Sequence, residues 1–303
     1  MNLGSSNINV SAISLGCMRI NGLEETQAQK LVEKAFDLGI NFFDHADIYG
    51  KGECEEIFGR ILKNSSIKRE DIIIQSKCGI VPGKMFDFSK EHILNSVDGI
   101  LKRIDTDYLD VLLLHRPDTL VEPEEVSEAF DTLYKQGKVK AFGVSNQNSM
   151  QIELLKKYLK QDIVANQLQF SIPHSSMISA GLEVNMATDG AINRDGSILD
   201  YCRLNNITIQ AWSPFQYGFF EGVFLNSEKY KELNEVIDDL AKKYNVSNIA
   251  IATAWILRHP ANMQVIVGTT NIDRLEVICE ATNITLTREE WYKLYISAGH
   301  ILP

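Results

Sequence analysis

Short apolar runs that end near a polar or ionisable residue recur along this chain, and no other feature restricts its fold as strongly. Four such runs cover residues 40–43, 71–75, 109–114 and 139–144, and the residues that follow them include Asp44, Tyr49, Lys77, His115 and Asn146. A strand buried in a parallel sheet has such a sequence. In a barrel of alternating strands and helices, the C-terminal strand ends meet at one mouth. The pattern therefore predicts that these distant residues lie together.

Helical segments separate the apolar runs, and the alternation continues along the chain. Predicted strands cover residues 12–15, 41–44, 72–76, 108–114, 141–144, 163–167, 207–212 and 265–267. Predicted helices cover residues 26–38, 53–62, 90–104, 123–135, 149–158, 197–205, 228–243, 247–258 and 272–281. We also expect a hairpin around residues 3–8, an irregular stretch at 170–194 and an extra helix at 287–298. This order predicts an α/β fold, a (β/α)₈ TIM barrel, with residues 1–303 as a single domain.

Capping residues support several of the predicted helix ends. Gly39 and Gly137 stand just past two helices, where glycine is favoured. Ser89 and Ser149 stand where an N-cap is expected, and Pro123 is in the first turn of its helix.

Composition excludes several classes of function. The net charge is −10 with a pI near 5.2, and no Lys/Arg run exceeds two residues, so nucleic acid is not an expected partner. No apolar stretch approaches the ~18 residues of a membrane span, and no signal peptide is apparent. The cysteines, odd in number and scattered, predict neither a disulfide framework nor a zinc site. We therefore expect no membrane association, no metal and a reducing cytoplasm.

Seven segments resemble the aldo-keto reductase family, in the order and at the spacing found there. They read INFFDHADIYG (40–50), IIIQSKCG (72–79), LDVLLLHRPD (109–118), KVKAFGVSN (138–146), VANQLQFS (164–171), IQAWSPF (209–215) and VIVGTTNIDRLEV (265–277). The first resembles the family's Asp-x-Ala-x-x-Tyr-Gly segment. The resemblance runs from about residue 12 to residue 277, and the sequence looks most like the bacterial YdhF-type branch of oxidoreductases.

The resemblance implies reduction of a small-molecule aldehyde or ketone to an alcohol by hydride transfer. The implied cofactor is NADPH, with NADH possible. The implied catalytic set is Asp44, Tyr49, Lys77 and His115. Tyr49 would be the proton donor, tuned by Lys77 and Asp44, and His115 would orient the carbonyl.

Elementary electrostatics explains why a phenol needs an amine in this role. A free phenol has a pKa near ~10 and is a poor acid at neutral pH. An ammonium within ~4 Å favours the phenolate by roughly 4 kcal/mol at an effective dielectric of ~20, about 3 pKa units before burial offsets it. Lys77 is therefore expected to make Tyr49 a competent proton donor, with Asp44 keeping the amine charged and oriented.

The resemblance also implies residues that bind the cofactor. Ser145, Asn146 and Gln167 would bond the nicotinamide carboxamide, and Trp212 would stack on the ring. Backbone groups of Ser213, Pro214, Phe215 and Gly218 would face the pyrophosphate, and Gly268, Thr269, Thr270 and Arg274 the 2′-phosphate. No Gly-x-Gly-x-x-Gly motif is present, so the cofactor would bind without a Rossmann domain.

The substrate side is less well defined. Met18, Ile48 and Arg116 are candidates for substrate contact. Met18 stands where an aromatic residue is common, and Gly268 where a lysine often binds the 2′-phosphate. Arg116 is equally consistent with attracting an anionic substrate and with pairing to Asp118.

Two alternatives remain beside the reductase. A metal-dependent hydrolase would gather further His or carboxylate residues at strand ends, where only His45 and His115 are found. A cofactor-binding redox sensor or regulatory barrel would keep the same residues but turn over slowly. The sequence does not indicate the oligomeric state or the physiological substrate.

Overall fold

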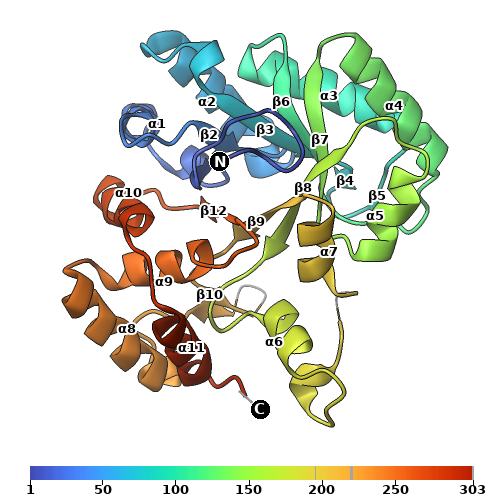
Figure 1. Cartoon of the computed structure of the whole chain (residues 1–303). Coiled ribbons are helices and arrows are strands. Elements are labelled where there is room, and N and C mark those ends of the chain that lie inside the picture. The colour runs from blue at the N-terminus through green and yellow to red at the C-terminus, as the bar shows by residue number, and fades with distance from the viewer. Residues whose placement is uncertain (195, 219–220, 302–303) are drawn as a thin grey trace.

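Eight parallel strands form a closed barrel in the computed structural model, which describes residues 1–194, 196–218 and 221–301 (Figure 1). The barrel strands are β1 (Ile13–Gly16), β2 (Phe42–Asp44), β3 (Ile73–Cys78), β6 (Leu109–Leu114), β7 (Val139–Ser145), β8 (Ile163–Gln169), β9 (Thr208–Trp212) and β12 (Gln264–Val267). Around the barrel the order is β1-β12-β9-β8-β7-β6-β3-β2, and β1 pairs with β2 to close it. The predicted TIM barrel is confirmed.

Helices surround the strands on the outside of the barrel (Figure 1). The ring consists of α1 (Glu25–Asp37), α2 (Glu53–Asn64), α3 (Lys90–Ile104), α4 (Pro123–Lys135), α5 (Ser149–Lys156), α7 (Ile198–Leu204), α9 (Asn248–Leu257) and α10 (Ile272–Cys279). Three more helices, α6 (Ser176–Leu182), α8 (Lys231–Tyr244) and α11 (Arg288–Ser297), are added to it. Short 3₁₀ turns lie at Ile20–Gly22, Tyr49–Gly52, Arg69–Asp71, Asp189–Ala191, Glu228–Tyr230 and Glu280–Asn283. No helix in these ranges is long and apolar enough to cross a membrane.

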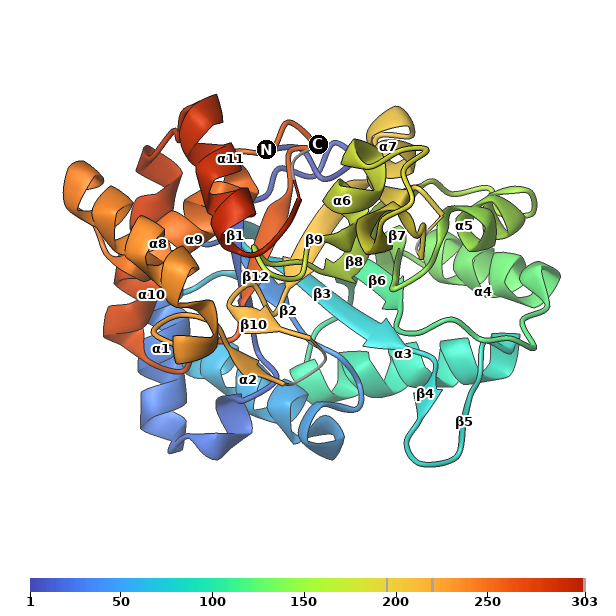
Figure 2. The same cartoon turned by 90° about the horizontal axis from the view of Figure 1, so that it is seen from below.

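Two small antiparallel hairpins extend from the strand ends. One joins β4 (Ile80–Val81) to β5 (Met85–Phe86) and projects away from the barrel in Figure 2, and the other joins β10 (Gln216–Tyr217) to β11 (Gly222–Val223). Neither hairpin was predicted. Each strand in them is only two residues long, too short for an alternating pattern to be visible in the sequence.

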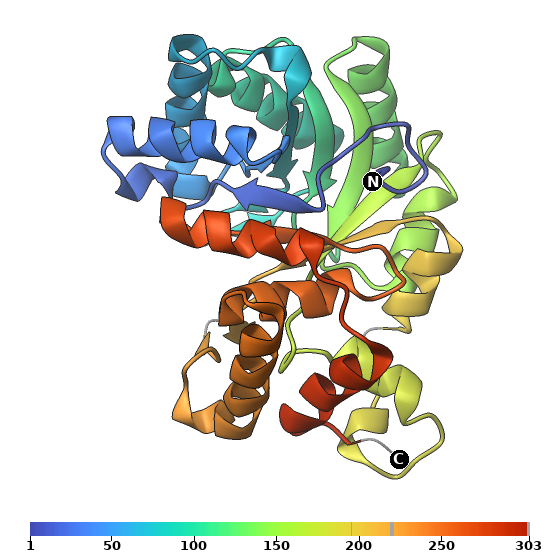
Figure 3. The same ribbon diagram turned by 60° about the vertical axis from the view of Figure 1, so that its left-hand side comes forward.

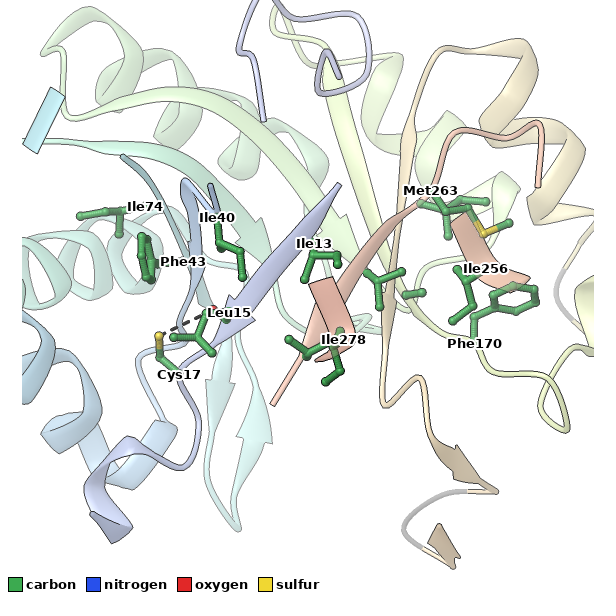
Figure 4. Close-up of a cluster of buried hydrophobic side chains, with 14 of the residues drawn as sticks. Ile13, Leu15, Cys17, Ile40, Phe43, Ile74, Phe170, Ile256, Met263 and Ile278 are labelled. Atoms are coloured by element: carbon green, nitrogen blue, oxygen red, sulfur yellow. Dashed lines mark hydrogen bonds between the residues drawn. The ribbon is translucent and has the colours of Figure 1, made fainter. Parts of the chain in front are cut away.

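Two buried apolar clusters hold the barrel together. The larger lies between the strands and the helices, and Figure 4 shows part of it, including Ile13 and Leu15 of β1 and Ile278 of α10. The smaller contains Phe42, Val111 and Leu113 of the strands together with Leu3 and Val10 of the N-terminal segment. That segment forms the expected hairpin only as an isolated bridge between Asn2 and Asn9.

The predicted capping residues are confirmed with one exception, although several helices begin or end two or three residues from the predicted positions. The hydroxyl of Ser89 accepts a hydrogen bond from His92 N, and Pro123 is the first residue of α4. The prediction that Ser149 caps α5 is wrong, since Asn148 is the N-cap and forms a reciprocal capping box with Gln151. The hydroxyl of Ser149 instead donates to the carbonyl of Gly196 at 2.5 Å.

The stretch 170–194 is not irregular throughout, contrary to expectation. It contains α6 and a 3₁₀ turn, and α6 lies beside α11 at the C-terminal part of the fold (Figures 1 and 3). The hydroxyls of Ser179 and Tyr295 are 2.7 Å apart, and Met177 and Ile178 are buried. Because these contacts come from the end of the chain, the local sequence of α6 gave no sign of them.

Candidate active site

The C-terminal ends of β2, β3 and β6 bring the four predicted catalytic side chains together. Asp44 is the last residue of β2, and Lys77 precedes the last residue of β3. His115 follows β6, and Tyr49 begins the 3₁₀ turn Tyr49–Gly52. Left-handed backbone at residues 50–52 in this turn reverses the chain after the tyrosine.

The ammonium of Lys77 is the centre of the arrangement. Its Nζ lies 2.8 Å from each carboxylate oxygen of Asp44, 3.1 Å from the hydroxyl of Tyr49 and 2.7 Å from the carbonyl oxygen of His45. Lys77 is fully buried and Asp44 nearly so. An ammonium has three protons, and four oxygens surround this one, so both its position and its charge are well defined.

Burial and charge set the protonation states of this group. Burial alone would lower the pKa of Lys77, but the charges and hydrogen bonds of Asp44 and Tyr49 raise it above its usual value. The pKa of Tyr49 is also raised, because burial outweighs the opposing effect of Lys77. Lys77 lowers the pKa of the phenol as expected, but burial raises that pKa by more. Tyr49 is a phenol, with a proton to give, across the neutral range.

His115 is neutral in this environment. Burial, together with the charges of Lys77 and Arg116, lowers its pKa well below the usual value. Its ring stands edge-on to Tyr49, with centroids 6.0 Å apart, and Nδ1 is buried without a hydrogen-bond partner among the described residues. A neutral imidazole beside a phenol can bond a substrate oxygen without competing for the proton of Tyr49.

A cavity of about 1150 Å³ opens above these residues. The predicted residues that line it are Met18, Asp44, Ile48, Tyr49, His115, Arg116, Ser145, Asn146, Gln167, Trp212, Ser213, Pro214, Phe215, Gly268, Thr269, Thr270 and Arg274. Lys77 lies beneath the floor. Gly218 is not among the lining residues, and its carbonyl accepts a hydrogen bond from Gln169 at 2.6 Å. Apart from these two, all the predicted site residues reach the same cavity.

Polar side chains at the C-terminal ends of β7 and β9 are hydrogen-bonded to one another at one wall of the cavity. Asn146 Nδ2 donates to the hydroxyl of Ser145 at 2.7 Å, and Trp212 Nε1 donates to Asn146 Oδ1 at 3.4 Å. Asn146 and Ser213 both have positive φ, 55° and 50°, which is costly for a residue with a Cβ. Strained backbone of this kind is characteristic of ligand sites.

Gln167 has a different environment from the one predicted. Its Nε2 donates to Asp44 Oδ1 at 3.1 Å and to Gln210 Oε1 at 3.2 Å, so the amide is bonded into the barrel. No donor to its Oε1 is found in the described part of the chain. That oxygen remains available to accept from an amide N–H in the cavity.

Gly268, Thr269, Thr270 and Arg274 lie at the start of α10, whose N-cap is Asn271. A side chain at position 268 would meet nothing within 4 Å, so the absence of a lysine there leaves open space. Arg274 is exposed on the rim, beside the carboxylate-bearing Asp273, which also lines the cavity.

On the substrate side, Arg116 lies with its guanidinium 5.9 Å from the ring centre of Trp212. The carboxylate of Asp118, the alternative partner, accepts hydrogen bonds from the backbone N–H groups of Phe88 and Leu120. Met18 and Ile48 also line the cavity.

A sequence model described as the Aldo/keto reductase family matches residues 12–296. The chain belongs to the aldo/keto reductase family. It is an oxidoreductase of that family. Asp44, Tyr49, Lys77 and His115 all lie in the sequence segments that resemble the family.

Related proteins cover nearly the whole of this aldo/keto reductase. It is 33% identical to the uncharacterized oxidoreductase YcsN of Bacillus subtilis, over 99% of this chain and 98% of the relative. It is 34% identical to a 6-dehydroglucose reductase of Agrobacterium fabrum, over 97% and 96%, and 32% identical to oxidoreductase YdhF of Escherichia coli, over 91% and 89%. Among solved structures, the thermostable aldo-keto reductase Tm1743 in complex with epalrestat matches with a TM-score of 0.79 at 28% identity, over 98% of each chain.

Several lining residues of this aldo/keto reductase were not foreseen. They include Arg19, Asn226, Ser247, Asn248 and Asp273. Ser247 caps α9 and accepts from Ala250 N, so the N-terminus of that helix faces the cavity. The serine before an apolar helical run was a visible signal for the cap, but only the fold shows that it points to the site.

Proposed function

We propose that this aldo/keto reductase reduces an aldehyde or ketone to an alcohol with NADPH, and less efficiently with NADH. The observation that supports this most strongly is the contact of Lys77 with both Asp44 and Tyr49 beneath the cavity. This contact holds the protonated hydroxyl of Tyr49 where the carbonyl oxygen of a substrate in the cavity can reach it.

In this proposal each side chain has one task. A nicotinamide, when bound, supplies hydride to the carbonyl carbon. Tyr49 gives its proton to the oxygen, which becomes negative during the transfer. Lys77 stabilises the phenolate left behind, Asp44 holds Lys77 charged, and neutral His115 bonds the substrate oxygen and orients it.

The cavity residues fit a dinucleotide. Ser145, Asn146 and the free Oε1 of Gln167 would bond the carboxamide, and Trp212 would stack on the ring. Ser213, Pro214 and Phe215 would face the pyrophosphate, and Thr269, Thr270 and Arg274 the 2′-phosphate. Gly218 does not line the cavity and its carbonyl accepts from Gln169, so we assign it to support of this loop. The positive φ of Asn146 and Ser213 supports a ligand role for these residues.

Two relatives guide the choice of substrate. Both are named 6-dehydroglucose reductase, at 34% and 32% identity. Met18, Ile48 and Arg116 would contact the substrate, and Arg116 provides a cation and hydrogen-bond donors for a polar or anionic group. We therefore expect polar aldehydes, including 6-dehydroglucose, to be better substrates than apolar ones. The free thiols of all five cysteines agree with a reducing compartment, the cytoplasm.

The test is a panel of aldehydes and ketones followed by oxidation of NADPH and of NADH. We expect turnover on at least one aldehyde, loss of that turnover in Tyr49→Phe, and unchanged NADPH binding by fluorescence titration. Tight NADPH binding with no turnover on any carbonyl would contradict the proposal and support the regulatory barrel instead.

A further inference from the structure

Glutamine side chains from four strands gather inside the barrel beneath the site. Gln75 of β3, Gln210 of β9 and Gln264 of β12 are fully buried, and Gln167 of β8 is 4% exposed. Strand register places Gln75 beside Asp44, and Gln210 beside both Gln167 and Gln264. Gln75 meets Gln210 from a strand that is not adjacent to β9. Side chains at one level of a barrel normally form an apolar layer of branched residues. Here four buried amides lie among the interior side chains.

The amides form a continuous hydrogen-bonded chain that ends on Asp44. Gln264 Nε2 donates to the carbonyl of Ser11 at 2.8 Å, and Gln210 Nε2 donates to Gln264 Oε1 at 2.9 Å. Gln210 and Gln75 exchange hydrogen bonds of 3.1 and 2.9 Å through their amides. Gln75 Nε2 then donates to Asp44 Oδ1 at 2.7 Å. We call Gln264, Gln210 and Gln75 the glutamine chain.

The glutamine chain acts on one oxygen of the Asp44 carboxylate in particular. Asp44 Oδ1 accepts from Gln75, Lys77 and Gln167, whereas Oδ2 accepts from Lys77 alone among the described residues. A carboxylate with several fixed donors cannot rotate freely, and its orientation decides where the ammonium of Lys77 stands. That ammonium in turn fixes the hydroxyl of Tyr49 at 3.1 Å.

Stability alone does not require such a chain. Buried polar groups are costly to desolvate, and well-packed apolar residues often do as well or better in a core. Hydrogen bonds in a buried series also polarise one another, so the bond that Gln75 Oε1 accepts from Gln210 strengthens Gln75 as a donor to Asp44. A series that is fully satisfied and ends on a charged group is suited to holding that group in place.

We propose that Gln75 is a positioning residue for Asp44, supported by Gln210 behind it, with Gln264 as the anchor of the glutamine chain. This rests on the proposed function, since the position of Asp44 matters through Lys77 and Tyr49. The effect of each glutamine on the position of Asp44 becomes smaller with its distance from Asp44 along the glutamine chain. Gln75 thus affects proton donation directly, Gln210 less, and Gln264 very little.

The experiment compares Gln75→Met with Gln264→Met, which remove the same amide from the same barrel level at opposite ends of the chain. Steady-state kinetics on the best aldehyde gives kcat and KM, fluorescence titration gives the NADPH Kd, and thermal unfolding gives Tm. A positioning role predicts a fall in kcat with KM and Kd almost unchanged, whereas a merely structural role predicts a fall in Tm without that selective loss of kcat.

For Gln75→Met we expect kcat to fall about tenfold, with KM and Kd within about twofold of wild type. For Gln264→Met we expect kcat within about twofold of wild type, with a fall in Tm comparable to that of Gln75→Met. Gln210→Met should be intermediate in kcat. It replaces Gln75→Met as the test variant if that protein does not fold.

Two results would overturn the inference. One is a loss of kcat that follows the loss of Tm equally in both variants, and the other is a kcat of Gln75→Met within about twofold of wild type. Tyr49→Phe, measured in parallel, separates this from failure of the proposed function. If Tyr49→Phe abolishes turnover while Gln75→Met behaves as wild type, only the glutamine chain loses its role.

Discussion

Lys77 donates to both carboxylate oxygens of Asp44 at 2.8 Å, and both side chains are buried. A buried pair of this kind is weak support for stability but costly to break, because removal of one partner leaves the other charge unpaired. The pair is therefore best understood through what it does for the hydroxyl of Tyr49, which the same ammonium contacts.

We expect Lys77→Met to lower both turnover and stability. Met retains much of the apolar stem but leaves Asp44 as an unpaired buried charge, so the free energy of unfolding should fall by about 3–5 kcal/mol. Urea unfolding measures this loss. The matched control is the double variant Lys77→Met with Asp44→Asn, which removes both charges and should recover a large part of the stability but none of the activity. Equal stability of the single and double variants would show that the pair is not coupled.

Tyr49→Phe isolates the proton donor. The ring and its packing remain, and only the hydroxyl is lost, so kcat should fall by about 10²–10⁴-fold, the usual contribution of a general acid. NADPH affinity should be unchanged. Steady-state kinetics with a matched titration of NADPH fluorescence makes the comparison. A kcat near that of wild type would remove Tyr49 from the mechanism.

His45 predicts a specific loss of stability in acid. Burial, with a further effect of Lys77, lowers its pKa to about 3, and neither ring nitrogen has a partner in the described structure. Between about pH 6.5 and 3 the unfolded chain binds a proton at this residue that the folded protein does not, so stability falls as pH falls through this window. From pH 7 to pH 5 the loss due to His45 should be roughly 2 kcal/mol.

His45→Leu tests this, because it removes the titrating group and keeps an apolar contact to Phe58, whose ring centre is 4.5 Å from that of His45. The wild type should lose roughly 2 kcal/mol more than the variant between the two pH values in urea titrations. Asp47 acts in the opposite direction, since burial and the charge of Glu55 raise its pKa to about 7. Asp47 is present in both proteins, so its contribution to the pH dependence cancels when the two proteins are compared. Parallel pH profiles for the two proteins would refute the assignment.

Arg274→Ala addresses the choice of cofactor. If Arg274 bonds the 2′-phosphate, NADPH affinity should fall about tenfold, near the lower end for a charged contact because the side chain is exposed, and NADH affinity should hardly change. Asp273→Asn is the control of opposite sign, since loss of a nearby negative charge should tighten NADPH alone. Titrations of both cofactors against the three proteins decide the matter. Equal losses for NADPH and NADH would place Arg274 at the pyrophosphate or in a structural role.

The sequence was sufficient to predict the barrel because each strand and helix carries its own local pattern. The end of β6 was placed correctly from its apolar run, and His115 follows it as predicted. The same patterns could not predict α6, whose stabilising contact between Ser179 and Tyr295 joins residues distant in the chain. Local signals fail wherever the decisive neighbour is remote in sequence.

The candidate site shows the same limit at the level of single side chains. The meeting of Asp44, Lys77 and Tyr49 was foreseen, but the raised pKa of Tyr49 was not, because burial depends on every element around the mouth. Gln75 was counted as part of an apolar run, since a run gives the hydropathy of a strand and not the partner of each side chain. Its bond to Asp44 depends on register between strands, which only the folded barrel supplies.

The left-handed backbone of Asn146 and Ser213 sets a limit on how this enzyme can be stabilised. Glycine would adopt φ of 55° or 50° without the steric cost of a Cβ, a relief of about 1 kcal/mol at each position. It would also remove the amide that joins Ser145 to Trp212 and a hydroxyl from the cavity wall. Selection for heat resistance alone would therefore favour glycine at both positions and erode ligand binding, so thermostable variants that keep activity have to gain their stability elsewhere in the fold.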